Sequence, residues 1–251
     1  MVHVDEGQIS ATALSLKDVC KSFGAVVVAD SVSFNLPKGQ TLGVLGPNGA
    51  GKTTLFNLIT GAVSADTGSV LFEGKDITAL DAARRCRLGI SRSFQIPQPF
   101  GGMSVFENVL VGAWHGANLS RDKAHDATLA VLDQTGLSEK VNQTAGKLTL
   151  LDRKRLELAR ALAANPKVLL LDEIAGGLTE HECQQLIETI KHIKNTGVTI
   201  IWIEHIVHAL LAVVDRLIVI DFGKIVADGK PDDVMSSQLV RDIYMGPESH
   251  A

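Results

Sequence analysis

The most constraining feature of this chain is a glycine-rich loop that lies between a short apolar stretch and a helical pattern. The loop contains the complete pattern G-x-x-x-x-G-K-T, from Gly46 to Thr53. Because glycine has no side chain, the backbone N–H groups of such a loop can surround a phosphate chain closely. In this pattern the lysine reaches the β- and γ-phosphates, and the next hydroxyl binds Mg²⁺. The sequence therefore predicts a nucleotide site formed by Gly46, Asn48, Gly49, Ala50, Gly51, Lys52, Thr53 and Thr54.

The residues around this loop favour an α/β fold with a parallel sheet. Residues 41–45 form an apolar strand before the loop, and residues 52–60 form a helix after it. Three further apolar runs, at residues 168–171, 198–203 and 216–220, are typical of strands that are buried on both faces. The alternation of strands and helices predicts a nucleotide-binding fold of the P-loop NTPase class.

Two other regions differ in character from this core. Apolar and polar residues alternate in residues 13–23 and 26–34, which predicts an N-terminal antiparallel β subdomain. Between the P-loop and the later strands, short helical patterns separated by Gly, Pro and Asn predict an inserted α-helical subdomain. We therefore expect one domain over residues 1–251. Its expected parts are a core at about 12–92 and 156–230, a helical insert at about 93–155 and a tail at about 231–251.

Composition excludes several classes of function. The chain has 24 basic and 28 acidic residues and a net charge of −4, so it has no basic excess that would favour nucleic acid as a partner. Its three cysteines lie far apart without a CxxC pair, which argues against a disulfide framework or a structural zinc site. No apolar run approaches the roughly 18–20 residues of a membrane span. The N-terminal residues lack the pattern of a signal peptide, so we expect any action at a membrane to need a partner.

A second chemical element is the apolar run Leu169-Leu170-Leu171, which ends in Asp172 and Glu173. A strand that ends this way presents its carboxylates at the carboxyl edge of the sheet, where a nucleotide-bound Mg²⁺ would lie. Asp172 is therefore a candidate metal ligand, and Glu173 is a candidate to polarise an attacking water.

Further motifs follow in a fixed order. Lys21-Ser22-Phe23-Gly24 precedes the P-loop and Ser93-Phe94-Gln95 follows it; a helical pattern over 148–162 precedes the acidic strand end, and Glu204-His205 follows it. Together these motifs resemble the ATP-binding subunits of ABC transporters, and the resemblance extends from Phe23 to about Gly246.

This resemblance implies ATP and Mg²⁺ as ligands and a role for each motif residue. Phe23 matches the aromatic residue that stacks on adenine, and Gln95 matches the glutamine that contacts Mg²⁺ and the attacking water. Glu173 matches the general base, and His205 matches the histidine that holds the γ-phosphate and orients the water. Thr149 matches the serine that contacts the γ-phosphate of the nucleotide bound to the opposite subunit.

The chain departs from the family pattern in the segment around Thr149. The usual Leu-Ser-Gly-Gly-Gln is replaced by Leu148-Thr149-Leu150-Leu151-Asp152. Two leucines replace glycines, and Asp152 is expected to add a negative charge near the γ-phosphate. Ile174 replaces the usual proline after the glutamate, and the loop that normally ends in Asp or Asn ends in Gly177-Leu178-Thr179. We expect hydrolysis to persist with altered contacts between subunits.

The helix after this segment has a periodic pattern. Leu151, Leu158, Ala159 and Leu162 are expected to form its buried stripe, and the basic run at residues 153–155 is expected to form a solvated face.

Details of the motifs resemble the ATPases of branched-chain amino-acid importers. These details are the P-loop and residues 93–100, 103–109, 175–178 and 243–246. The resemblance implies Leu, Ile, Val or a related small amide or urea as the transported ligand. It also implies a homodimer or a heterodimer with a paralogous ATPase, two transmembrane permease subunits and a periplasmic or extracellular substrate-binding protein. The expected location is peripheral, on the cytoplasmic side of a prokaryotic inner membrane.

Other functions share parts of this pattern. An ATPase that drives lipid or lipopolysaccharide extraction has the same core. A non-transport ABC protein would act as a nucleotide-switched binding module, but such proteins carry two nucleotide domains or a long coiled coil, for which this chain is too short. A small-molecule P-loop kinase would need neither the helix after Thr149 nor His205.

Overall fold

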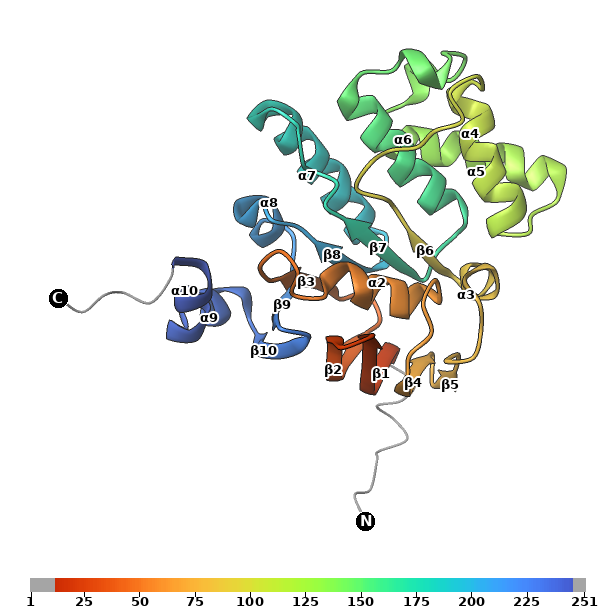
Figure 1. Cartoon of the computed structure of the whole chain (residues 1–251). Helices are drawn as coiled ribbons and strands as arrows, with labels where there is room; N and C mark the ends of the chain where they lie inside the picture. Colours follow the sequence, from red (N-terminus) through yellow and green to blue (C-terminus); the bar gives the residue numbers. More distant parts are fainter. Residues whose placement is uncertain (1–11, 246–251) are drawn as a thin grey trace.

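The computed structural model describes residues 12–245, and its centre is a six-stranded sheet. β3, β6, β7, β8 and β9 pair in parallel, while β10 pairs antiparallel with β9 at one edge (Figure 1). The strands in spatial order are β10 (Lys224–Gly229), β9 (Arg216–Asp221), β3 (Thr41–Leu45), β8 (Thr199–Ile203), β7 (Val168–Asp172) and β6 (Ile90–Arg92).

Side chains of the central strands alternate between two apolar cores. Leu170 and Ile201 belong to the core on one face, whereas Leu169, Leu171 and Trp202 belong to the core on the other. Every residue of β3, β7 and β8 is buried. Burial on both faces explains why these strands are continuously apolar in the sequence.

A second, antiparallel sheet covers one face of the central sheet, with α2 between the two sheets (Figure 1). This confirms the expected N-terminal β subdomain. Its strands in spatial order are β2 (Val26–Pro37), β1 (Thr12–Phe23), β4 (Thr67–Phe72) and β5 (Lys75–Asp76). Two helices accompany it in sequence, α2 (Lys52–Thr60) directly after β3 and α3 (Ala82–Leu88) directly before β6.

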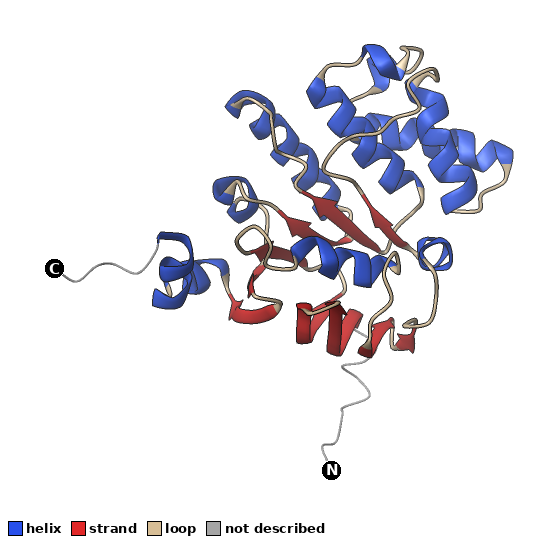
Figure 2. Ribbon diagram, in the orientation of Figure 1, coloured by secondary structure: helices blue, strands red, loops and turns tan. Residues whose placement is uncertain are grey.

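The expected helical subdomain forms a lobe beyond β7 and β6 (Figure 2). It begins at a capping box in which the Ser104 hydroxyl accepts the Glu107 N–H and the Glu107 carboxylate accepts the Ser104 N–H. The last helix, α6, also packs on β7, so the sequence boundary expected at residue 155 falls inside it. The elements are α4 (Val105–Val111), η1 (Gly112–Gly116), α5 (Arg121–Gln134), η2 (Ser138–Lys140), η3 (Ala145–Lys147) and α6 (Leu150–Ala163).

The C-terminal half completes the second face of the sheet. α7 begins at a second capping box, formed by Thr179 and Glu182, and buries one apolar stripe against the core. Among the described residues, no helix is long and apolar enough to span a membrane. The remaining helices are α7 (Glu180–Asn195), α8 (Val207–Leu211), α9 (Pro231–Ser236) and α10 (Gln238–Met245).

Candidate nucleotide site

The glycine-rich loop has a backbone that only glycine can adopt at two positions. Gly46 and Gly51 have φ values of +157° and +105°. A Cβ on Gly46 would lie 2.2 Å from the carbonyl oxygen of Ile220, and a Cβ on Gly51 would lie 2.3 Å from that of Val28. α2 starts directly after Gly51 and has no side-chain cap. Its first N–H groups are therefore available to an anion.

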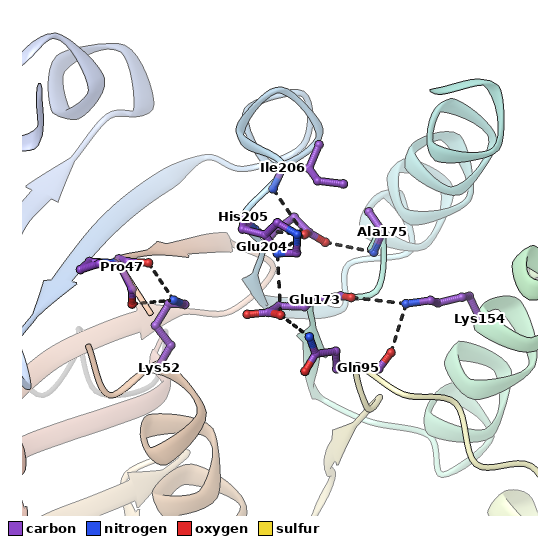
Figure 3. A network of polar contacts seen from close by, with 10 residues as sticks. Pro47, Lys52, Gln95, Lys154, Glu173, Ala175, Glu204, His205 and Ile206 are labelled. Atoms are coloured by element: carbon purple, nitrogen blue, oxygen red, sulfur yellow. Dashed lines mark hydrogen bonds and ion pairs between the residues drawn. The ribbon is translucent and has the colours of Figure 1, made fainter. Parts of the chain in front are cut away.

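Lys52 is buried, and its ammonium group lies over the loop (Figure 3). Its Nζ donates to the carbonyl oxygens of Gly46 at 2.7 Å and Pro47 at 3.0 Å. Burial lowers the pKa of Lys52, and the negative charges of Glu173 and Asp172 oppose that shift. The loop therefore holds one cation at the carboxyl edge of the sheet, as the phosphate-binding interpretation requires.

The acidic strand end lies at the same edge. Asp172 ends β7, is buried and forms an ion pair with Arg92, which also donates to the Asn57 side chain at 2.6 Å. Glu173 has a left-handed backbone with φ +45°, and its N–H donates to the carbonyl of Ile203 on β8 at 2.8 Å. Strand β8 therefore helps to fix the turn that aims the glutamate.

Two of the other predicted residues converge on Glu173 from separate parts of the chain (Figure 3). The Gln95 side-chain amide donates to Glu173 Oε2 at 2.5 Å. The Nδ1 atom of His205 lies 3.7 Å from the same oxygen. The three side chains come from the ends of β6, β7 and β8, which are neighbours in the sheet. Their meeting follows from parallel pairing, because the carboxyl ends of parallel strands share one edge.

The three predicted magnesium ligands line one cavity of about 460 Å³. They are the Thr53 hydroxyl, the Gln95 amide and the Asp172 carboxylate, all of which are oxygen donors of the kind that Mg²⁺ prefers. Across residues 12–245 no group of three or more His, Cys, Asp and Glu side chains could hold a metal ion. These oxygen donors are compatible with a magnesium ion that shares its ligands with phosphates, and Arg92, which pairs with Asp172, lines the same cavity.

Comparisons with known proteins agree with this geometry. The family model described as ABC transporter matches residues 29–176. The chain is 33% identical to a probable branched-chain amino acid transport ATP-binding protein, LivG, of Methanocaldococcus jannaschii, and the match covers 93% of this chain and 97% of the relative. This chain belongs to the ABC transporter family.

Two further relatives and two solved structures place it within the family. The chain is 31% identical to LivG of Salmonella typhimurium (95% of this chain, 99% of the relative) and 31% identical to LptB, the lipopolysaccharide export ATP-binding protein of Escherichia coli K12 (94% and 98%). Two crystal structures of ABC cassettes, one nucleotide-free and one of MJ1267 in its ADP conformation, each give a TM-score of 0.84 at 33% identity. They cover 93% and 94% of this chain, and the chain covers 98% and 99% of theirs. The protein is an ABC ATPase.

The signature segment of this ABC ATPase differs from the sequence-based expectation in one respect. Thr149 caps α6: its hydroxyl accepts the Asp152 N–H at 3.3 Å and lies 2.7 Å from the Asp152 carboxylate. Asp152 is buried and forms an ion pair with Lys140. The carboxylate that is expected to add a negative charge near a neighbouring γ-phosphate is therefore paired with a cation of its own chain. Leu150 is half-exposed at the start of the helix, and Leu151 is buried as expected.

Phe23 and Thr149 take no part in the contacts that join Gln95, Glu173 and His205. Phe23 ends β1, its ring is half-exposed, and Lys21 Nζ lies 5.3 Å from the ring centroid. Within residues 12–245, no hydrogen bond or ion pair joins Phe23 or Thr149 to the glycine-rich loop. Their assigned roles remain predictions.

The sequence did not single out Glu204 as part of the site. Its side chain is 1% exposed and accepts the N–H groups of Ala175 at 3.0 Å, His205 at 3.0 Å and Ile206 at 3.4 Å. It therefore holds the loops after β7 and β8 together (Figure 3). The sequence feature that points to Glu204 is a carboxylate directly after a buried strand, similar to the feature that identified Asp172.

The basic run on α6 departs in part from the solvated face that the sequence predicts. Arg153 and Arg155 are partly exposed, but Lys154 is only 4% exposed. The difference arises because α6 packs against both the helical lobe and β7, so more than one of its faces is buried. Burial lowers the pKa of Lys154, and the charges of Glu204 and Glu173 oppose this shift.

Proposed function

We propose that this ABC ATPase is the energising subunit of an importer for branched-chain amino acids or chemically related small amides or urea. The observation that carries the proposal is full-length similarity to two LivG proteins, at 33% and 31% identity, together with a complete set of hydrolysis motifs at one sheet edge. Similarity to LptB at 31% supports lipopolysaccharide extraction as the second candidate.

The proposed chemistry starts with phosphate binding. The loop from Gly46 to Thr53 offers its N–H groups to the phosphate chain, and Lys52 exchanges its contacts with two carbonyl groups for contacts with phosphate oxygens. Magnesium, when bound, neutralises charge that develops on the β- and γ-phosphates. Thr53, Gln95 and Asp172 are the residues that would hold it.

The proposed hydrolytic step is water attack on the γ-phosphorus, which breaks its bond to the β–γ bridging oxygen and releases ADP. Glu173 takes the proton from the water, and Gln95, which donates to the same carboxylate, orients the water. His205 holds the γ-phosphate from the other side of Glu173. Phe23 stacks on the adenine ring, and Thr149 contacts the γ-phosphate of a nucleotide held by an opposing subunit.

The proposed assembly is a dimer of this chain with itself or with a paralogous ATPase, bound to two transmembrane permeases and served by a periplasmic or extracellular substrate-binding protein. A cavity of about 380 Å³ between α3, β6, η1 and α6 offers a permease docking place. The exposed Phe94 lines this cavity, and the exposed Trp114 belongs to η1, whose Gly112 and Gly116 line it. We place the chain peripherally, on the cytoplasmic side of a prokaryotic inner membrane.

The test compares transport and hydrolysis in the assembled complex. The neighbouring permease genes are expressed with this chain, the complex is placed in liposomes, and ATP hydrolysis is measured with and without the substrate-binding protein loaded with leucine. We expect leucine-dependent stimulation that is lost in Glu173→Gln and Lys52→Ala. Stimulation by lipopolysaccharide instead would support the second candidate. A dimer that binds ATP without hydrolysing it, even with its permeases, would contradict the expectation that the altered signature permits hydrolysis.

A further inference from the structure

Lys154 joins three parts of the site that are distant in the sequence. It lies on α6, and its Nζ donates to the backbone carbonyl oxygens of Gln95 at 3.1 Å and Glu173 at 3.5 Å. Figure 3 shows the side chain reaching from the helix to both carbonyl groups. The two residues that it holds are the ones whose side chains meet at 2.5 Å. One ammonium group therefore fixes the backbone on both sides of that contact.

The charge of Lys154 also fits its surroundings. A buried ammonium group is unfavourable unless charged or polar partners compensate for lost water. The nearby carboxylates are Glu173 and the fully buried Glu204, and both interact favourably with the lysine charge. Glu204 in turn holds the N–H groups of Ala175 and His205. The lysine is thus the cation of a network that spans the loops after β6, β7 and β8.

Because Lys154 lies on α6, it links the network to that helix. The N-cap of the same helix is Thr149, five residues earlier, and the helix forms one wall of the cavity that extends to η1. A rigid shift of α6 therefore moves the anchor of the Gln95 and Glu173 backbones. Short, packed helices transmit such shifts because cores rearrange between discrete states instead of deforming continuously.

We propose that Lys154 is a positioning residue for hydrolysis: it holds the Gln95 loop and the Glu173 backbone in register with α6. The inference rests on the roles proposed above for Gln95 and Glu173. It does not depend on which ligand is transported. Its ammonium group donates to the backbone carbonyl oxygens of Gln95 and Glu173, so it acts through the two residues that it holds.

The test compares three full-length variants by ATP hydrolysis, ATP binding and amide hydrogen exchange. Lys154→Met removes the charge and both hydrogen bonds at similar volume, and Lys154→Arg retains a cation. Lys123→Met is the matched control, because Lys123 is an exposed lysine on α5 in the same lobe. We expect Lys154→Met to lower kcat by about tenfold or more while KM for ATP changes less than about twofold, since misplacing reacting groups affects the chemical step most.

Hydrogen exchange supplies a readout that does not need turnover. Amides of residues 93–98 should exchange about tenfold faster in Lys154→Met, because opening of that loop loses its tether. Lys154→Arg should restore both kcat and exchange to within about threefold of wild type, and Lys123→Met should match wild type. A general loss of stability would instead speed exchange throughout the core and lower the thermal midpoint without a selective effect at 93–98.

Glu173→Gln, assayed in parallel, separates two kinds of failure. If Glu173→Gln hydrolyses ATP at the wild-type rate, the proposed roles around Glu173 are wrong. If Glu173→Gln is inactive while Lys154→Met retains wild-type kcat and exchange, the positioning role of Lys154 is overturned. If Lys154→Met does not fold, Lys154→Gln takes its place, with the same kcat and exchange criteria.

Discussion

The N-termini of α2 and α6 differ in whether a side chain caps their free N–H groups. α2 begins after Gly51 without a side-chain cap, and its first N–H groups stay available. α6 begins at Thr149, which caps it, and a buried carboxylate from Asp152 lies in its first turn. The positive end of the helix dipole is therefore open in α2 and satisfied from within the chain in α6.

This difference shows that the two helix N-termini serve different purposes: that of α2 is open to a ligand, whereas that of α6 is stabilised by side chains of its own chain. An open N-terminus next to glycines attracts an external anion, and Lys52 adds a positive charge there. A capped N-terminus gains stability from its own side chains, and the pair of Asp152 with Lys140 anchors it to η2. The departures from the family signature thus lie at the capped N-terminus of α6, whereas the glycine-rich loop keeps its complete pattern.

The largest expected effect comes from distorting the open N-terminus of α2 with Gly51→Ala. Its Cβ would lie 2.3 Å from the Val28 carbonyl oxygen at φ +105°, so the loop must move. We expect ATP affinity, measured by calorimetry, to fall at least about tenfold, with about 2 kcal/mol lost from the free energy of unfolding. Gly197→Ala is the control, because Gly197 has φ +87° with no atom near its Cβ. Equal ATP affinities in both variants would contradict the role of the open N-terminus of α2 in binding ATP.

The next largest effect comes from removing the carboxylate in the first turn of α6 with Asp152→Ala. Removing the carboxylate leaves the Lys140 ammonium and the Thr149 hydroxyl without their partner. Because Lys140 is partly exposed, we expect a loss of about 2 kcal/mol in urea unfolding, below that of a fully buried pair. Asp126→Ala, at an exposed carboxylate on α5, should change stability by less than about 0.5 kcal/mol. A neutral Asp152→Ala would show that the cap does not stabilise α6.

A smaller effect follows from removing the cap hydroxyl itself. Thr149→Ala should destabilise the protein by about 1 kcal/mol, and Thr149→Ser should restore most of that loss. Thr179→Ala at the start of α7 is a matched comparison, since Thr179 also accepts the N–H three residues on. Urea unfolding of the three variants measures the difference. If Thr149→Ala were as stable as wild type while Thr179→Ala was not, Thr149 would not act as a cap.

The smallest effect concerns a second carboxylate on α6, Glu157. Burial raises its pKa, and the pairing with Arg160 at 3.1 Å only partly offsets the shift. Since the pKa is higher in the folded than in the unfolded chain, its contribution to stability is fully present below the unfolded pKa and is lost as pH rises through the folded pKa. Glu157→Gln should avoid that loss, so its stability relative to wild type should increase from acidic to neutral pH. A difference independent of pH would contradict this assignment.

Much of the fold follows from local patterns. The apolar run before Asp172 and the glycine spacing from Gly46 to Gly51 each lie within a few residues of the sequence. The structure places a buried strand and a loop followed by a helix where these patterns predict them. The parallel order of the strands then brings Gln95, Glu173 and His205 to one edge. The chemical roles of these residues stay predictions until the variants are measured.

The sequence by itself determined the family, the sheet edge and the identity of the groups gathered there, because strand periodicity and glycine spacing are local properties. Only the tertiary structure decided that Lys154 is buried and that Asp152 is neutralised by Lys140. The same is true of Glu204, which joins two loops. These outcomes depend on which faces of α6 and which strand ends pack together. That choice is set by contacts between residues far apart in the chain, such as Lys154 with Gln95, and no local pattern encodes it.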